Sequence, residues 1–231
     1  GTVKVWNMQN HSLVATLPNH ENSVCVAAVT QEGDVLTLAT GSAGIAQNNT
    51  IAGHTTRIWQ VDVATGDTHM LNAVANDHDG PIRDICTVGD GLLATCSNDG
   101  TVKIRDAQTG VTQSTLVFVQ AQHPPMLLSL AVGDNFLAAA AEDGHVVVWE
   151  MHENGVTMGE PQVLRHAQCV WKVLVLPEGD LATCSQDGML RIFTRATERM
   201  ASVQDRQAFA KEVQEAVQKT QNGPRPEEVA K

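Results

Sequence analysis

The sequence predicts an all-β protein in which four-stranded antiparallel sheets repeat as the blades of a propeller, followed by a C-terminal α-helix. One observation is a repeat, because LATCSNDG at 93–100 returns as LATCSQDG at 181–188, with LAAAAEDG between them at 137–144. A second is the spacing, since the aspartates of these segments are 44 residues apart. A third is that each period holds four short β-prone runs. A period of about 40–45 residues with four strands predicts propeller blades.

The best-defined repeat shows how the chain divides into strands. Its β-prone runs cover 82–88, 92–97, 101–105 and 112–118, and they are separated by Gly-Asp-Gly, Asn-Asp-Gly and Thr-Gly, as hairpins require. Applied to the whole chain, this pattern predicts a propeller over 1–195 and a helix with a linker over 196–231. The predicted blades are 20–74, 78–118, 123–164 and 166–195, with a partial blade at 1–17.

Two features of the first repeats depart from this pattern. About ten extra residues, within 43–54, interrupt the turn that elsewhere holds the aspartate. We expect a flexible surface loop there, which is either a partner contact or a neutral elaboration. Gly1 to Trp6 match a third strand after an Asp-Gly turn, so the sequence begins within a repeat. We therefore expect the chain to be the C-terminal part of a propeller with seven blades.

The residues after the last blade predict a helix. Ser202 is suited to cap its N-terminus, with Asp205 as the acidic third residue. Apolar residues at 209, 213, 216 and 217 fall on one helical face. Asn-Gly-Pro-Arg-Pro at 222–226 ends the helix and opens a linker. The helix either docks on the side of the propeller or connects it to another domain, and both roles are compatible.

Composition excludes several classes of function. The formal charge is −11, and the residues before Arg195 hold eight Lys and Arg against twenty Asp and Glu. Nucleic acid is bound through clustered basic residues, so this acidity favours a basic protein surface or simple solubility instead. The sequence has neither a membrane-length apolar run nor the layout of a signal peptide. We therefore expect no membrane partner and a cytoplasmic and nuclear location.

The five cysteines predict no metal site. They form no Cys-x-x-Cys pair, are odd in number and mostly lie in apolar, strand-like runs. A reduced thiol in such a run behaves as a small hydrophobic side chain. We interpret all five as reduced core thiols, and the sequence indicates no cofactor.

The pattern resembles WD repeats in four features. They are a histidine before each unit, a hydroxyl on the second strand, an aspartate in the turn and a Trp-like position on the third strand. In that class these four side chains form a buried hydrogen-bonded tetrad. The resemblance implies three such sets: His78, Thr95 and Asp99, with Arg105 at the tryptophan position; His123, Asp143 and Trp149, with Ala139 at the hydroxyl position; and His166, Thr183 and Asp187, ending on Phe193. A catalytic site occurs once, whereas these sets repeat, so we predict no enzyme.

The segment from Cys169 to Val213 carries a narrower resemblance. Trp171 follows the start of a first strand, an Asp-Gly turn leads to a strand ending in Phe193-Thr194, and a helix containing Ala208-Phe209 follows. These features resemble the last blade and following helix of the phospholipase-A-two-activating protein family. The AEDG turn at 141–144, followed by a strand ending in Trp149, resembles the blade before it.

This resemblance implies a propeller that binds ubiquitin. It also implies that the whole protein is a cofactor of the AAA ATPase segregase and docks on that ATPase through domains outside this sequence. The implied function is a non-catalytic adaptor in ubiquitin recycling and proteasome-dependent protein turnover. Despite the family name, the sequence lacks a Gly-x-Ser-x-Gly nucleophile elbow. The alternative is a scaffold subunit of another multiprotein complex.

Propellers of this class bind mainly through one rim, with residues three and five positions after each histidine and just before each turn aspartate. Apolar anchors with a polar surround are typical of protein interfaces. The candidate ubiquitin-binding residues are therefore Pro81, Arg83 and Asn98; Met126, Leu128 and Glu142; and Cys169, Trp171 and Gln186.

Overall fold

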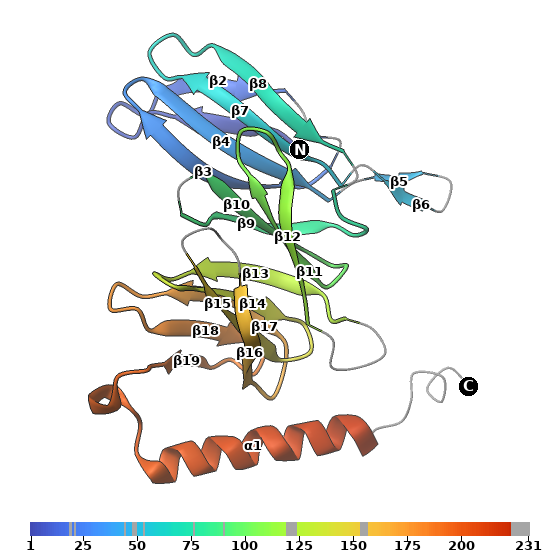
Figure 1. Cartoon of the computed structure of the whole chain (residues 1–231), viewed down its shortest axis with the longest axis vertical. Helices are drawn as coiled ribbons and strands as arrows, with labels where there is room; N and C mark the ends of the chain where they lie inside the picture. Colours follow the sequence, from blue (N-terminus) through green and yellow to red (C-terminus); the bar gives the residue numbers. More distant parts are fainter. Residues whose placement is uncertain are drawn as a thin grey trace.

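The computed structural model describes residues 1–18, 20, 22–43, 45–47, 50–52, 54–75, 77–89, 91–118, 124–152 and 157–222. Within these residues the chain is mostly β-strand, and one long helix follows the last strand. The sheets succeed one another along the long axis of the molecule as an open arc, with the helix at the C-terminal end (Figure 1). The predicted all-β propeller architecture with a C-terminal helix is confirmed.

Among the described residues, five antiparallel sheets form the arc. The first sheet holds β1 (Val3–Trp6) and β2 (Leu13–Leu17). The β3–β8 blade holds β3 (Val24–Glu32), β4 (Val35–Ser42), β7 (Thr56–Asp62) and β8 (Thr68–Val74). The β9–β12 blade holds β9 (Ile82–Thr87), β10 (Leu92–Ser97), β11 (Thr101–Asp106) and β12 (Thr112–Val117). The β13–β16 blade holds β13 (Leu127–Val132), β14 (Phe136–Ala141), β15 (His145–Met151) and β16 (Thr157–Arg165). The β17–β19 blade holds β17 (Val170–Val175), β18 (Leu181–Ser185) and β19 (Leu190–Phe193).

The blades pack face to face through alternating apolar residues. Because side chains alternate across a strand, each blade sends one set toward the preceding blade and one toward the next. Cys96 and Ile104 of the β9–β12 blade, for example, share a buried cluster with Leu127 and Leu137 of the β13–β16 blade. The innermost strands follow the same order, with β9 between β3 and β13, and β13 beside β17.

The insertion at 43–54 is a strand pair where we expected a flexible loop, and that expectation is wrong. β5 (Ile45–Gln47) and β6 (Thr50–Ala52) pair antiparallel, and the hairpin projects from the side of the arc (Figure 1). The sequence explains the strands, because Ile45, Thr50 and Ile51 are β-branched residues, which favour strands.

The C-terminal helix has the predicted cap and the predicted face. After a 3₁₀ turn, η1 (Thr197–Arg199), α1 spans Val203–Asn222. Ser202 Oγ accepts a hydrogen bond from the Asp205 amide at 3.1 Å. Val213 is buried, and the Phe209 ring meets Phe193 of β19 edge-on, with ring centroids 6.3 Å apart. The helix therefore docks on the last blade through its apolar face.

The cysteines are all free, and their surroundings differ more than predicted. Cys96 is buried, but Cys184 on the outer face of β18 is exposed, so the expectation that all five lie in the core is wrong for Cys184. Burial, reinforced by the charge of Asp84, raises the pKa of the Cys25 and Cys86 thiols to about 12. These two thiols stay protonated and unreactive at neutral pH.

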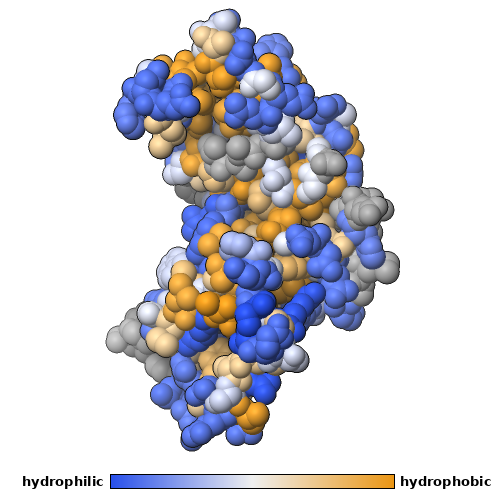
Figure 2. Space-filling model, turned by 90° about the vertical axis from the view of Figure 1, so that its left-hand side faces the viewer, coloured by the Kyte–Doolittle hydropathy of each residue, from blue (hydrophilic) through white to orange (hydrophobic). Residues whose placement is uncertain are grey.

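Among the described residues, no helix has the length and apolar character needed to cross a membrane. Figure 2 shows hydrophobic surface in the middle and lower parts of the face it views, interspersed with hydrophilic residues. Among the exposed apolar side chains are Trp171 and Leu174 of β17 and Leu190 and Ile192 of β19. The last blade thus carries much of the apolar surface of this end.

Candidate partner-binding rim

The predicted rim residues lie in pairs that repeat from blade to blade. In each of three blades, the residue before the turn aspartate donates its amide hydrogen to the carbonyl of the residue before the inner strand. The bonds run from Asn98 to Pro81 at 3.0 Å, from Glu142 to Met126 at 3.0 Å and from Gln186 to Cys169 at 2.8 Å. The fold therefore places six of the nine predicted residues together as three equivalent pairs at one end of the strands.

The other three predicted residues are β-bulges. Arg83, Leu128 and Trp171 are the second residues of β9, β13 and β17. In each blade the register skips this residue, so that it has no partner on the neighbouring strand. A bulge re-aims a side chain and is common beside functional sites. Leu128 is half-buried, whereas Arg83 is exposed and Trp171 is 55% exposed.

The rim combines apolar and charged chemistry. Leu128, Met126 and Trp171 offer apolar contact surface, and Arg83 and Glu142 are charged. The Glu142 carboxylate accepts a hydrogen bond from the Met126 amide at 3.2 Å, which holds it beside the apolar residues. Protein–protein interfaces typically combine aromatic and apolar anchor residues with polar groups around them. The arrangement suits recognition of a folded partner.

The β3–β8 blade contains a buried hydrogen-bonded set of side chains that the sequence interpretation missed. His20 Nε2 lies 2.6 Å from Thr40 Oγ1, and Trp59 Nε1 donates to the same hydroxyl at 2.9 Å. All three side chains are buried. The signal was present, because His20 and Trp59 stand at the repeat positions. The insertion removed the turn aspartate, so the set did not resemble the others.

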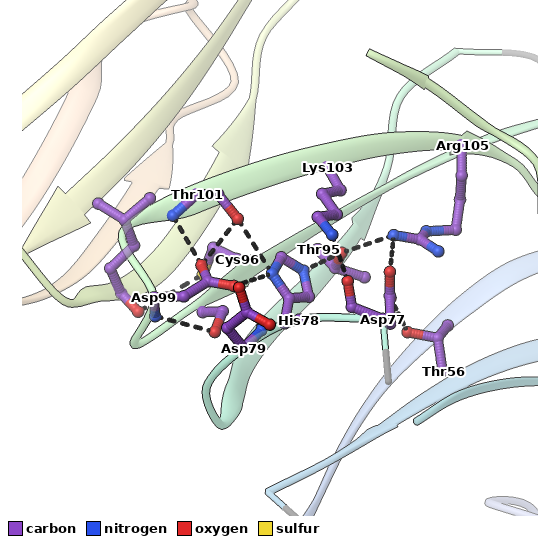
Figure 3. A network of polar contacts seen from close by, with 12 residues as sticks. Thr56, Asp77, His78, Asp79, Thr95, Cys96, Asp99, Thr101, Lys103 and Arg105 are labelled. Atoms are coloured by element: carbon purple, nitrogen blue, oxygen red, sulfur yellow. Dashed lines mark hydrogen bonds and ion pairs between the residues drawn. The ribbon is translucent and has the colours of Figure 1, made fainter. Parts of the chain in front are cut away.

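The β9–β12 blade contains the predicted set (Figure 3). His78 Nδ1 lies 2.9 Å from Asp99 Oδ2, and His78 Nε2 lies 2.8 Å from Thr95 Oγ1. Asp99 also accepts hydrogen bonds from the amide and hydroxyl of Thr101, at 2.8 and 2.7 Å. Although burial opposes it, the bonds from His78 and Thr101 hold the pKa of the Asp99 carboxyl well below its usual range. Asp99 is therefore ionised at neutral pH.

Arg105 replaces the tryptophan of this set and brings in a further carboxylate. Its guanidinium Nη2 lies 3.4 Å from Thr95 Oγ1, so the arginine reaches the same hydroxyl that the tryptophan reaches elsewhere. Nη2 also donates to Asp77 Oδ1 at 2.5 Å, and Thr56 of β7 donates its hydroxyl to Asp77 Oδ2 at 2.7 Å (Figure 3). Arg105 and Asp77 are both buried. This ion pair joins the β9–β12 blade to the β3–β8 blade.

The set predicted for the β13–β16 blade is only partly visible. His123 lies outside the described residues. Trp149 is buried as predicted, and Ala139 is buried at the position that holds a hydroxyl in the neighbouring blades. Asp143 Oδ2 lies 2.8 Å from Nδ1 of His145, the first residue of β15. Asp143 thus contacts a histidine on its own hairpin.

The set predicted for the last blade is incomplete. His166 Nε2 lies 2.8 Å from Thr183 Oγ1 as predicted, but Asp187 does not join them. Its carboxylate instead accepts from Ser185 Oγ at 2.5 Å and pairs with Arg191 at 2.8 Å. Grouping Asp187 with His166 was wrong. The guanidinium of Arg191, four residues after Asp187, is a stronger partner for a carboxylate than a neutral imidazole. Phe193 fills the tryptophan position and meets the His166 ring edge-on at 5.4 Å.

The hydroxyl and histidine pairs are structural. Thr40, Thr95 and Thr183 are all buried, so no substrate could reach their hydroxyls. Burial and the nearby positive charges of Arg57 and Arg191 lower the pKa of His20 and His166, respectively, to about 4. Both imidazoles are therefore neutral at pH 7, and each satisfies a buried hydroxyl.

Comparison with known proteins supports the same fold. The family described as WD domain, G-beta repeat matches residues 45–106 and 160–194, so the chain carries WD repeats. A propeller of this kind is typically a non-catalytic scaffold. The chain is similar in structure to the WD40 β-propeller domain of Doa1, with a TM-score of 0.68 and 28% identity, over 87% of this chain and 60% of that one. It also shares its fold with Saccharomyces cerevisiae Sqt1, with a TM-score of 0.66 and 14% identity, over 87% of this chain and 55% of that one.

Two curated relatives are similar in sequence. The ubiquitin homeostasis protein lub1 of Schizosaccharomyces pombe is 29% identical over 138 residues, which cover 59% of this chain and 18% of that protein. The phospholipase A-2-activating protein of Xenopus laevis is 42% identical over 50 residues, which cover 22% of this chain and 6% of that protein. The resemblance predicted from the residues after Cys169 is confirmed, and the chain spans less than a fifth of the length of either relative.

Proposed function

We propose that this chain is a non-catalytic adaptor module that binds ubiquitin through the rim formed by the three bulged inner strands. One observation carries the proposal: Arg83, Leu128 and Trp171, which the resemblance to WD-repeat propellers implies as rim residues, are the unpaired bulge residues of three successive blades. The relatives add the choice of partner, because one of them is a ubiquitin homeostasis protein.

The chemistry of the rim fits the proposed partner. Ubiquitin offers a hydrophobic patch with basic residues around it, as the family resemblance implies. Trp171 and Leu128 supply apolar contact surface, and Glu142 supplies a negative charge held beside Met126. Exposed aromatic residues contribute much of the energy in protein interfaces, so Trp171 is expected to be the principal anchor.

The test is a titration of isotope-labelled ubiquitin with the chain, followed by nuclear magnetic resonance. Binding should shift the resonances of the hydrophobic patch, and Trp171→Ala should weaken the affinity by roughly tenfold or more. Trp6→Ala is the matched control, because Trp6 is 52% exposed but lies on β1, in a sheet without predicted rim residues. It should leave the affinity unchanged. An undisturbed ubiquitin spectrum at millimolar protein would reject the proposal.

The wider role follows the same resemblance. In this proposal the module serves ubiquitin recycling and proteasome-dependent turnover together with an AAA ATPase segregase, in the cytoplasm and nucleus. Isolation of the ATPase with the full-length protein from both compartments would test the partnership and the location. Rim variants of the full-length protein should still bind the ATPase, which docks through other domains, but should no longer deliver ubiquitylated substrates. The alternative is a scaffold subunit for another complex, and an intact rim that ignores ubiquitin while retaining a different protein partner would favour it.

A further inference from the structure

One carboxylate connects the inner strands of three blades. Asp84 Oδ2, on β9, accepts hydrogen bonds from the hydroxyl of Ser129 at 3.1 Å and from the amide of Leu130 at 3.0 Å, both on β13. The same oxygen accepts from Lys172 Nζ, on β17, at 2.8 Å. Ser129 Oγ in turn accepts from the Val173 amide at 3.4 Å. The network therefore runs from β9 through β13 to β17.

The three side chains of this network each belong to the residue that directly follows a bulge residue of the rim. Asp84 follows Arg83 on β9, and Ser129 follows Leu128 on β13. Lys172 follows Trp171 on β17. A bulged residue lacks a cross-strand partner, so its position depends on how its chain neighbours are held. The carboxylate of Asp84 holds all three neighbours at once.

The remaining four-stranded blade lacks both features. The start of β3 is in regular register, with Val24 opposite Ser42 and Cys25 opposite Gly41, so no residue there is bulged. The third residue of β3 is Val26, which has no polar side chain. The bulges at the start of the inner strand and the polar bridge therefore occur in the same three blades.

We propose that Asp84 is a positioning residue for the rim. By joining β9, β13 and β17 through one carboxylate, it sets the spacing between Arg83, Leu128 and Trp171, so that these side chains contact one partner surface together. This inference rests on the proposed ubiquitin binding. Asp84 itself does not contact the partner, and it acts through the strands that carry the three side chains.

The main experiment is the ubiquitin titration repeated with Asp84→Asn. This change keeps the size of the side chain but removes the charge that attracts Lys172, and we expect binding on the order of tenfold weaker. Asp134→Asn is the matched control, because Asp134 is an exposed carboxylate in the turn between β13 and β14. It should bind ubiquitin as the unchanged chain does. Equal affinity of the Asp84→Asn variant, at unchanged fold, would overturn the proposal.

A second variant tests the proposal even if Asp84→Asn does not fold. The Lys172 side chain is 57% exposed, so Lys172→Met should fold while losing only the link to β17. We expect weaker ubiquitin binding for Lys172→Met and recovery of most of the affinity for Lys172→Arg, which retains the charge. Equal affinities for the two variants would contradict the proposal.

A double-mutant cycle separates positioning from general stability. If Asp84 acts by placing Trp171, then Asp84→Asn should cause little further loss of affinity once Trp171→Ala has removed the anchor. Losses that simply multiply would show that Asp84 and Trp171 act independently, and the proposal would fail.

A readout without ubiquitin distinguishes failure of this proposal from failure of the proposed function. With 5-fluorotryptophan incorporated, the fluorine resonance of Trp171 is assigned by its loss in Trp171→Ala. Asp84→Asn should shift and broaden that resonance and leave the resonance of Trp6 unchanged. If the unchanged chain does not bind ubiquitin, the proposed function fails, and the fluorine spectrum still decides whether Asp84 positions Trp171. An unaltered Trp171 resonance would reject the positioning role.

Discussion

The β3–β8 and β9–β12 blades solve the same packing problem with different residues on the third strand. In the first, Trp59 donates one hydrogen bond to Thr40 and otherwise fills apolar space. In the second, Arg105 reaches Thr95 from the same strand position and is completely buried. A neutral indole needs one acceptor, whereas a buried guanidinium needs a countercharge.

Asp77 supplies that countercharge, and this changes the boundary between the blades. Its carboxylate binds Arg105 on one side and the Thr56 hydroxyl of the preceding blade on the other. Lys103 also donates a hydrogen bond to the Asp77 carbonyl. At the tryptophan position, Trp59 thus joins an apolar cluster shared with β2 of the preceding sheet, whereas Arg105 forms a charged link to the preceding blade.

The largest expected effect comes from breaking the ion pair on one side. Asp77→Ala leaves the guanidinium of Arg105 buried without its countercharge, and we expect the free energy of unfolding to fall by about 3–5 kcal/mol. Urea denaturation followed by circular dichroism measures this. Asp134→Ala, at an exposed carboxylate, serves as the control. The double variant Asp77→Ala/Arg105→Met should recover most of the loss, and a loss below about 1 kcal/mol for Asp77→Ala would contradict this account.

For each residue a somewhat smaller effect is expected from pH, because burial lowers the pKa of two histidines. The pKa of His20 is lowered to about 4 by burial and by Arg57, and that of His166 is lowered similarly by burial and by Arg191. Below about pH 6.5 these two histidines bind protons in the unfolded chain but remain neutral in the folded chain. Stability should therefore fall as the pH drops from about 6.5 to about 4, by up to about 3 kcal/mol for each histidine.

Unfolding by urea across this pH range checks the prediction. His166→Gln keeps a hydrogen-bonding group near Thr183 but cannot titrate, so the slope of stability against pH should become clearly smaller. The Asp99 carboxyl acts in a different window, because its pKa is depressed. Its contribution is present above about pH 4, the ordinary value, and is lost only as the pH falls further. A slope that stays the same in His166→Gln would disprove the assignment.

The smallest effect compares the two threonines. Thr40 Oγ1 lies 2.6 Å from His20 Nε2 and accepts from Trp59 Nε1 at 2.9 Å, so Thr40→Val leaves two buried groups without this partner. Thr95→Val removes the partner of His78 Nε2, but His78 Nδ1 keeps Asp99 and Arg105 keeps Asp77. We expect losses of about 2 kcal/mol for Thr40→Val and about 1 kcal/mol for Thr95→Val. Thermal unfolding of the two variants measures the difference, and the reverse order would refute the comparison.

The predictions from sequence succeeded where a repeated pattern carried the information and failed where one residue competed with another. The spacing from each histidine located Arg83, Leu128 and Trp171, which the structure shows as equivalent bulges. The same spacing grouped Asp187 with His166, but Arg191 takes the carboxylate instead. A repeat gives the position of a residue, whereas the choice among nearby partners depends on distances that no repeat encodes.

Long-range contacts were outside the reach of the sequence for the same reason. Asp84 and Lys172 are 88 residues apart, and nothing in either repeat marks them as a pair. Thr56 and Asp77 meet across a blade boundary only because neighbouring blades pack face to face. Hydrogen bonds of this kind follow from the packing of one blade on the next.

The sequence by itself determined the architecture of this protein, because turn residues and alternating apolar runs recur every 44 residues and each repeat can form only one kind of sheet. Together with the resemblance to WD repeats, it also predicted which residues stand at the bulges of the inner strands. The tertiary structure alone decided how the buried charges are paired and how the blades are joined. Arg105 and Asp77, and Asp84 with β13 and β17, are brought together only when separate blades bury their faces against one another.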